Sequence, residues 1–105
     1  MAAPYNPPTK NEDFVIRIAL ADMNVGGSYK ANPTIAAGDF KVDKDGAGLV
    51  DLATLPTVSP AGSVLVKITL SAAEMNTDVV SIVCIDQTNP KEWADFVLTI
   101  PTVAA

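Results

Sequence analysis

Apolar and polar residues alternate with a period of two along much of this chain between residues 13 and 102. Successive side chains of a β-strand point to opposite faces of its sheet, so this alternation predicts strands with one buried face. The plainest examples lie at 14–20 and 64–70. Their expected buried faces are Phe14, Ile16, Ile18 and Leu20 in the first and Val64, Val66, Ile68 and Leu70 in the second.

Two later segments also predict strands. Residues 79–85 are apolar on both faces, which favours a central strand or one whose outer face meets another subunit. Residues 93–100 form the last expected strand. One of its faces carries Phe96, Leu98 and Ile100, and the other carries Trp93, Asp95, Val97 and Thr99.

Turn chemistry separates shorter elements between these strands. Phe40 and Val42 predict a short strand that ends at the sequence Asp-Lys-Asp-Gly, residues 43–46. Aspartate caps such a turn and glycine accepts a positive φ, so a hairpin with a return strand at 49–52 is expected. Ser71 and Glu74 match a capping box, which predicts one short helical turn over 71–76.

Together these elements predict an all-β protein, an immunoglobulin-like β-sandwich with one short helical turn; a small barrel is the alternative. The cysteine pair of antibody domains is absent, because Cys84 is the only cysteine. We divide the chain into an extended N-terminal arm (1–12), the sandwich (13–102) and a C-terminal tail (103–105).

The arm contains three prolines within five positions. Proline fixes φ and lacks an amide donor, so the arm is expected to be extended and unable to pair as a central strand. It is interpreted either as a frayed terminus or as a segment that docks on a partner. In the second interpretation the partner-binding residues are Pro4, Tyr5, Pro7 and Pro8.

Length, composition and charge narrow the classes of function. A chain of 105 residues with 49% hydrophobic residues and mean hydropathy +0.27 predicts one folded domain that buries some surface against partners, which favours a homo-oligomer. The net charge of −5 and the scattered basic residues disfavour nucleic acid. No signal peptide or membrane-spanning run is visible, so we expect a protein made in the cytoplasm and not secreted.

No residue pattern points to catalysis, a metal or a cofactor. The chain has no histidine, which excludes Ser/His/Asp and Cys/His nucleophiles and histidine metal sites. Residues 43–46 invite a calcium-loop interpretation, but with Gly46 at the sixth position the first and twelfth positions fall on Lys41 and Leu52, which cannot serve. Asp39 and Asp51 are possible further ligands, but a hairpin turn is favoured. Asp86 and Asp95 are expected to accept hydrogen bonds from turn amides rather than to act as a catalytic pair.

One resemblance covers nearly all of the chain outside the arm. The residues that carry it are Asn32 to Val42, Lys44-Asp45-Gly46, Asp51 to Pro56, Leu70 to Asn76, Asp86 and Trp93-Ala94-Asp95. Together they resemble small virion proteins of tailed bacteriophages that have immunoglobulin-like folds, which decorate capsids or belong to tails and baseplates.

The resemblance implies a non-enzymatic virion protein. We expect a capsid decoration protein that binds the capsid exterior in many copies, with the phage major capsid protein or tail proteins as partners. The alternative is a tail or baseplate component, or a receptor- or carbohydrate-binding module. A glycan binder is expected to show a surface aromatic pair beside a polar loop, and a decoration protein a flat apolar patch and an ordered arm.

Overall fold

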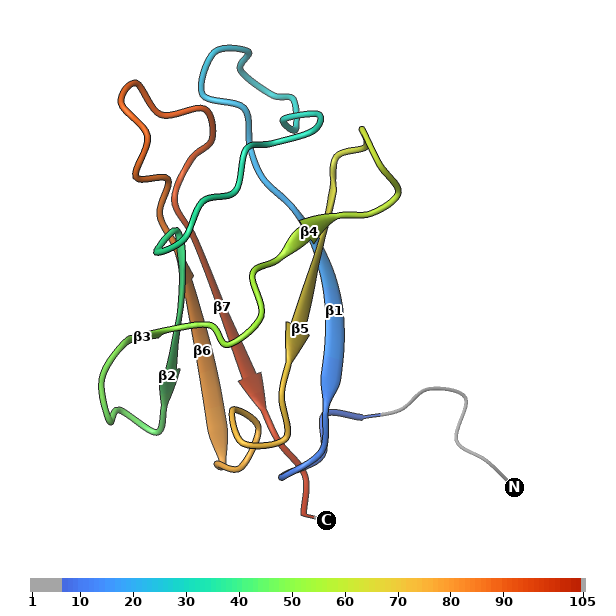
Figure 1. The fold of residues 1–105 in the computed structure, drawn as a ribbon, viewed down its shortest axis with the longest axis vertical. Helices are drawn as coiled ribbons and strands as arrows, with labels where there is room; N and C mark the ends of the chain where they lie inside the picture. Colours follow the sequence, from blue (N-terminus) through green and yellow to red (C-terminus); the bar gives the residue numbers. More distant parts are fainter. Residues whose placement is uncertain (1–6, 105) are drawn as a thin grey trace.

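The computed structural model describes residues 7–104, and Figure 1 shows long strands joined by loops at both ends. The seven strands are β1 (Phe14–Ala19), β2 (Phe40–Lys44), β3 (Val50–Asp51), β4 (Thr57–Val58), β5 (Leu65–Leu70), β6 (Val79–Cys84) and β7 (Phe96–Pro101). The described residues contain no helix. The expected all-β architecture is confirmed.

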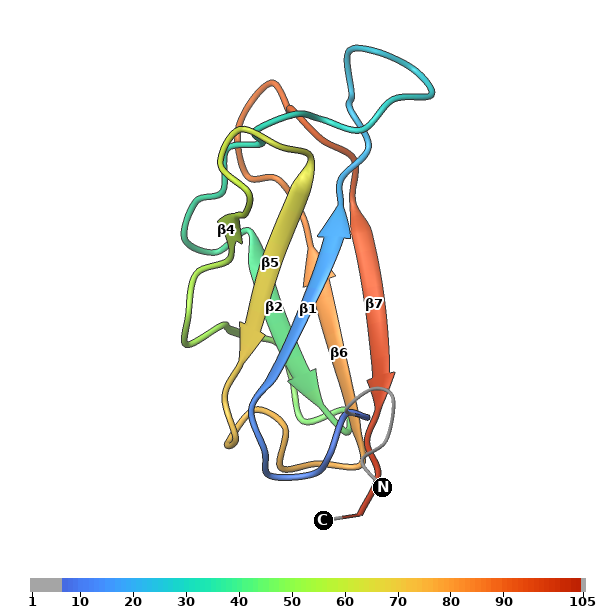
Figure 2. The ribbon, with the colours of Figure 1, turned by 90° about the vertical axis from the view of Figure 1, so that its right-hand side faces the viewer.

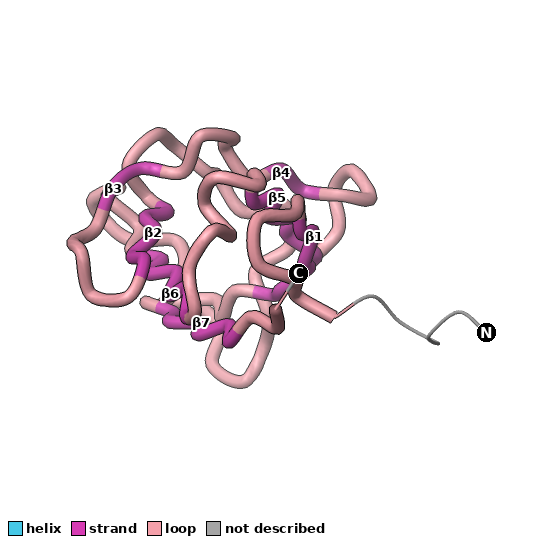
Figure 3. The backbone as a smooth tube through the Cα atoms, turned by 90° about the horizontal axis from the view of Figure 1, so that it is seen from below, coloured by secondary structure: helices cyan, strands magenta, loops and turns pink. Residues whose placement is uncertain are grey.

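The strands form two antiparallel sheets. One has the order β1-β5-β4 and the other the order β3-β2-β6-β7. Figure 2 shows β1 and β5 in front of the second sheet, and Figure 3 shows the two groups of strands from below. Two sheets that face each other across one core make a β-sandwich, as expected.

The inner faces of the two sheets supply the core. Every second residue of the inner strands β5 and β6 is fully buried, because each of these strands has neighbours on both sides and the opposite sheet above it. These residues are Val66, Ile68, Leu70, Val80, Ile82 and Cys84. The period-two pattern therefore identified the buried face of β5 correctly, and β6 lies between two neighbours, as a strand that is apolar on both faces predicts.

The hairpin expected after Phe40 also forms, since Lys41 pairs with Asp51 and Val42 with Val50. Its return strand β3 has only two residues, both exposed. Strand β4 was not expected from the pattern, because two residues are too few to show an alternation.

The segment 71–76 is a turn, and the prediction of a short helical turn there is wrong. One α-type bond forms, in which the Met75 amide donates to the Ser71 carbonyl at 3.0 Å. The Thr77 amide then bonds back to Met75 only two residues away, at 2.9 Å. The chain must enter β6 at Val79, so it tightens at once and no helix is propagated.

The capping box in this turn nevertheless forms as expected. The Ser71 amide donates to the Glu74 carboxylate at 2.9 Å, and the Glu74 amide donates to the Ser71 hydroxyl at 3.2 Å. These two bonds satisfy amides that the short turn leaves unpaired.

Trp93 is buried, although the alternation of the last strand places it on the face opposite Phe96. Its indole N–H donates to the Thr34 carbonyl at 3.2 Å, and its ring centroid lies 5.8 Å from that of Phe40. Strand β7 begins only at Phe96, so residues 93–95 do not continue its alternation. The side chain turns inward and is part of the core.

Candidate functional site

Three carboxylates are buried in the described part of the chain, and each binds backbone amides. Asp39 is 1% exposed and accepts hydrogen bonds from the amides of Ala36 and Gln87, at 2.9 and 3.0 Å. Glu74 accepts from the Ala53 amide at 3.0 Å in addition to its capping bond. These contacts join loops that are far apart in sequence. The carboxylates therefore hold these loops together.

Asp86 is held in the same way. Its carboxylate accepts from the Glu92 amide at 2.7 Å and from the Thr88 amide at 2.9 Å. Burial by itself would raise the pKa of Asp86, but these hydrogen bonds outweigh burial and hold the pKa below its ordinary value. The expectation that aspartates satisfy turn amides is confirmed for Asp86 and wrong for Asp95, which forms an exposed ion pair with Lys91 at 2.8 Å.

The aspartates of the β2–β3 hairpin also serve as hydrogen-bond acceptors. Asp43 accepts from the amides of Gly46 and Gly48 at 2.9 and 2.8 Å, and Asp45 accepts from the amides of 78–79 at 3.2 and 2.9 Å. The arrangement is a capped hairpin turn, as the sequence favours. Residues 7–104 contain no group of three or more acidic or cysteine side chains placed to hold a metal ion.

Cys84 is a buried core residue, as its place in an apolar strand predicts. Desolvation raises the pKa of its thiol to about 12. The thiolate is the nucleophilic form of cysteine, so this thiol is unreactive at neutral pH.

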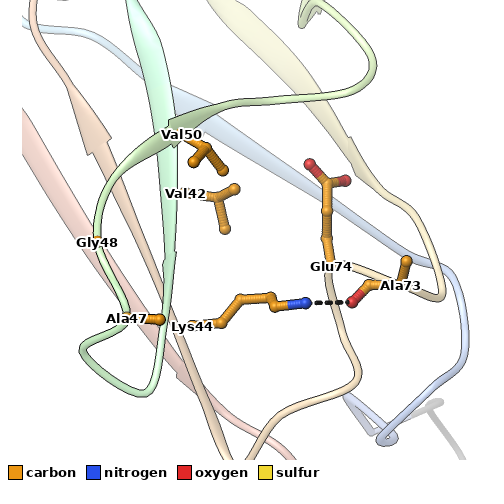
Figure 4. A pocket seen from close by; sticks show the side chains of 7 residues that line it. All are labelled: Val42, Lys44, Ala47, Gly48, Val50, Ala73 and Glu74. Carbon is orange, nitrogen blue, oxygen red and sulfur yellow. Dashed lines mark hydrogen bonds between the residues drawn. The ribbon is translucent and has the colours of Figure 1, made fainter.

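A pocket of about 220 Å³ lies beside the β2–β3 hairpin (Figure 4). Its lining is mainly apolar and consists of Val42, Lys44, Ala47, Gly48, Val50, Ala73 and Glu74. The Lys44 ammonium donates to the Ala73 carbonyl at 3.0 Å, while the Glu74 carboxylate points away from it. The pocket could take a small apolar side chain, but both of its charged groups are already engaged.

The predicted partner-binding residues are only partly within the described structure. Pro4 and Tyr5 lie outside the described residues, whereas Pro7 and Pro8 are half-buried at the foot of the sandwich. Pro7 borders a second pocket, of about 290 Å³. The other residues that line it are Thr9, Glu12, Asp13 and Phe14.

The second half of the expected arm is bound to its own domain, so residues 8–10 are not a frayed terminus. The Val103 amide donates to the Pro8 carbonyl at 2.8 Å, and the Lys10 amide donates to the Val103 carbonyl at 2.9 Å. The Lys10 ammonium also pairs with Asp78 at 2.5 Å. Sequence reasoning missed these contacts because they depend on where the C-terminal segment lies.

An apolar surface lies on the outer face of β6 and β7, and we call it the β6–β7 face. The strand register places Val83 beside Val97, Ser81 beside Thr99 and Val79 beside Pro101. Val97 is 62% exposed and Val79 is 37% exposed. Short, mostly β-branched side chains on two paired strands make this surface flat. The apolar run at 79–85 was the signal for its first half, but the register alone adds Val97 and Pro101.

A second exposed apolar group lies on the loop that joins β1 to β2. This loop is pinned at its base by a bridge between Ala21 and Tyr29, and it protrudes at the top of the sandwich in Figure 2. Met23, Val25 and Tyr29 are all more than half exposed on it. Loops longer than about 12–15 residues without secondary structure are uncommon and are often functional.

Comparison with known proteins found no match. No protein family matches the chain, and neither curated proteins nor solved structures show a significant match. Within residues 7–104, no helix is long and apolar enough to cross a membrane.

Proposed function

We propose that this protein is a non-enzymatic assembly protein that binds another protein surface through the β6–β7 face. The observation that carries the proposal is the exposure of Val79 and Val97 on this flat pair of strands. The polar side chains between the apolar rows are Ser81 and Thr99, and their hydroxyl groups lie within hydrogen-bond distance of each other, at 3.4 Å. Burial of these side chains against a partner is favourable because none of those on β6 and β7 is charged, and the charged Lys41 and Asp43 of β2 border them beside Val83 and Ser81.

The buried acidic groups support a binding role over catalysis. Asp39, Glu74 and Asp86 each have both carboxylate oxygens occupied by backbone amides. A general acid or base has to reach the substrate proton directly or through one water. These groups are committed to loop structure instead.

The particular role we propose is that of a phage capsid decoration protein, which rests on the resemblance in the sequence. Many copies would bind the capsid exterior, with the major capsid protein as partner and the virion as location. Each copy would add a modest interface at a subunit junction, and many such contacts together raise the barrier to rupture of the shell. Within the arm, Pro4, Tyr5, Pro7 and Pro8 would add to the attachment.

We also propose that the sandwich is immunoglobulin-like, and the strand order supports this. If β1 is equated with strand B of that fold, the sheet β1-β5-β4 corresponds to B-E-D and the sheet β3-β2-β6-β7 to C′-C-F-G.

A tail component or a receptor-binding module is the second candidate, because the β1–β2 loop displays Met23, Val25 and Tyr29 at one end of the sandwich. Tyr29 is the only aromatic side chain in residues 7–104 that is mostly exposed. A carbohydrate site usually stacks the sugar on aromatic residues, so the lack of a second one beside Tyr29 in this part of the chain disfavours the glycan-binding version.

The test is co-sedimentation of the protein with phage particles that lack it. Val97→Lys places a charge in the β6–β7 face and is expected to reduce binding at least tenfold, since an unpaired interfacial charge must be desolvated. The matched control is Val15→Lys. Val15 is 45% exposed and lies on the outer face of the other sheet, so this variant is expected to bind normally. Equal loss in both variants, or in neither, contradicts the proposal. Immunogold labelling of whole particles then distinguishes facets from tail.

A further inference from the structure

In the described part of the chain, no further strand lies between β1 and β7 on one side of the sandwich. Both strands are the outer members of their sheets and have six residues each. The Cα atoms of β1 and β7 stay more than 8 Å apart. The opposite side differs, because β3 and β4 have two residues each and the chain between them crosses from one sheet to the other.

The inner faces of these two strands are incompletely covered. Phe14 and Ile16 of β1 and Phe96 and Leu98 of β7 point toward the core but are only partly buried. Their cross-strand partners in β5 and β6 are Leu70, Ile68, Cys84 and Ile82, and all four are fully buried. In each cross-strand pair, therefore, the side chain on the edge strand is more exposed than its partner on the inner strand.

The free edge of β7 has a defined length. Above it, Asp22 is bridged to Trp93, and below it, Thr9 is bridged to Val103. Among the described residues, nothing pairs with the outer edge of β7 itself (Phe96–Pro101), which is about 20 Å long at 3.3 Å per residue. Residues 1–6, which precede Pro7 at the foot of this edge, span a similar length when extended.

The register of the Thr9–Val103 bridge prevents residues 1–6 from pairing with β7 of their own chain. Val103 bonds to the carbonyl of Pro8 and to the amide of Lys10, so even-numbered residues of the segment turn their backbone groups toward β7. Continued upward, this ladder would need amide donors from Pro8, Pro4 and, on β7, Pro101, and proline has none. The missing donors therefore disfavour continuation of the ladder in this register.

The odd-numbered residues of the same segment, Met1, Ala3 and Tyr5, all keep an N–H group. A copy of the segment that approaches from another molecule is not held in the even register. Backbone groups along β7 point alternately to its two sides, and those of Val103 point to the outer side, so those of Thr99 and Val97 do as well. The second copy's segment can turn the N–H groups of its odd-numbered residues toward them.

We propose that residues 1–6 of a second copy add an outer strand to β7 and cover Phe96 and Leu98. This is β-strand addition between identical molecules, in which backbone hydrogen bonds supply affinity and apolar pockets supply register. The pocket of about 290 Å³ that Phe14 lines also contains Thr9, which is bridged to Val103 just beyond β7. The biological purpose of this exchange rests on the proposed assembly role. The exchange itself is measured on purified protein without phage particles, so the exchange and the assembly role can fail separately.

The experiment separates exchange between copies from docking within a copy. A nitroxide spin label is placed on Asn6→Cys in protein without isotope label and mixed with ¹⁵N-labelled wild-type protein; the buried native Cys84 does not compete for the label. Only contacts between copies can then broaden amide signals. Broadening confined to β7 and the facing edge of β1 supports the proposal, and a label on Thr57→Cys in β4 is the positional control.

Two proline variants test the register. Ala3→Pro removes an odd-numbered donor and is expected to abolish the broadening and to lower self-association in sedimentation at least tenfold, whereas Ala2→Pro leaves the odd donors intact and is expected to preserve both. Absence of broadening between copies overturns the proposal, as does broadening that occurs only when spin label and isotope are on one chain. Equal effects of the two proline variants overturn the assigned register.

Discussion

Asp86 provides the sharpest test of the claim that buried carboxylates hold the loops of this sandwich. Its two oxygens accept amides of Thr88 and Glu92 at 2.9 and 2.7 Å, and the residue is 2% exposed. Asp86→Asn retains one acceptor oxygen but turns an NH₂ group toward the other amide. A hydrogen bond to a charged group contributes about 1.5–3 kcal/mol, so the substitution is expected to cost about 2 kcal/mol at neutral pH.

The pH dependence distinguishes this cause from a general packing defect. The pKa of Asp86 in the folded protein lies below its ordinary value of 3.8. The stabilisation is therefore complete above pH 3.8 and is lost as the pH falls through the lower folded pKa. The cost of Asp86→Asn should be full near pH 7 and should shrink in acid, where wild-type Asp86 also becomes neutral.

Urea unfolding measured near pH 7 and again at acidic pH checks both parts. With a slope of about 1.5 kcal/mol per molar, a cost of about 2 kcal/mol lowers the urea midpoint by roughly 1.3 M. Asp51→Asn is the control, because its exposed ion pair with Lys41 at 2.7 Å is worth at most about 1 kcal/mol. A cost for Asp86→Asn that is absent near pH 7, or the same at both pH values, would refute the argument.

Two further predictions concern the core thiol and the N-terminal segment. Cys84 is expected to resist thiol reagents at pH 8 until urea unfolds the protein, and rapid labelling of the folded protein would contradict this. Cys84→Ala is expected to lower the free energy of unfolding by on the order of 1 kcal/mol and to leave particle binding intact. Loss of binding would contradict this second expectation. Deletion of 1–6 should weaken attachment but leave the free energy of unfolding unchanged at protein concentrations where the chain is a monomer. Deletion of 1–10 should also lower that free energy by about 1–2 kcal/mol, because the hydrogen bonds to Val103 are lost. Urea unfolding and co-sedimentation of both truncations are the measurements, and attachment equal to that of the full chain would contradict the tethering role.

The strands that sequence reasoning located correctly are those with enough residues to show a pattern. The alternations around Ile16 and Ile68 mark inner faces because a side-chain period of two is a property of the strand itself. Strand β4 escaped notice, since Thr57 and Val58 belong to a strand only through their pairing with β5. The capping box of Ser71 and Glu74 was predictable because all its atoms lie within one short segment.

The errors occur where a neighbour distant in sequence decides the outcome. Trp93 fits the alternation of residues 96–100 in the sequence, but β7 begins only at Phe96. Outside the strand, the Trp93 indole N–H donates to the Thr34 carbonyl. Asp39 was considered only as a possible metal ligand, yet its carboxylate joins Ala36 to Gln87. No local pattern indicates which amide will lie opposite a carboxylate.

For this protein, the sequence by itself determined the fold class, the buried faces of β1, β5 and β7 and the lack of histidine chemistry. These properties follow from side-chain periodicity and composition, which require no knowledge of neighbours. Tertiary structure decided the flat β6–β7 face, the anchoring of residues 7–12 beside Val103 and the uncovered edge of β7. Each of these depends on strand order and register, which arise only when segments far apart in the chain pair with one another.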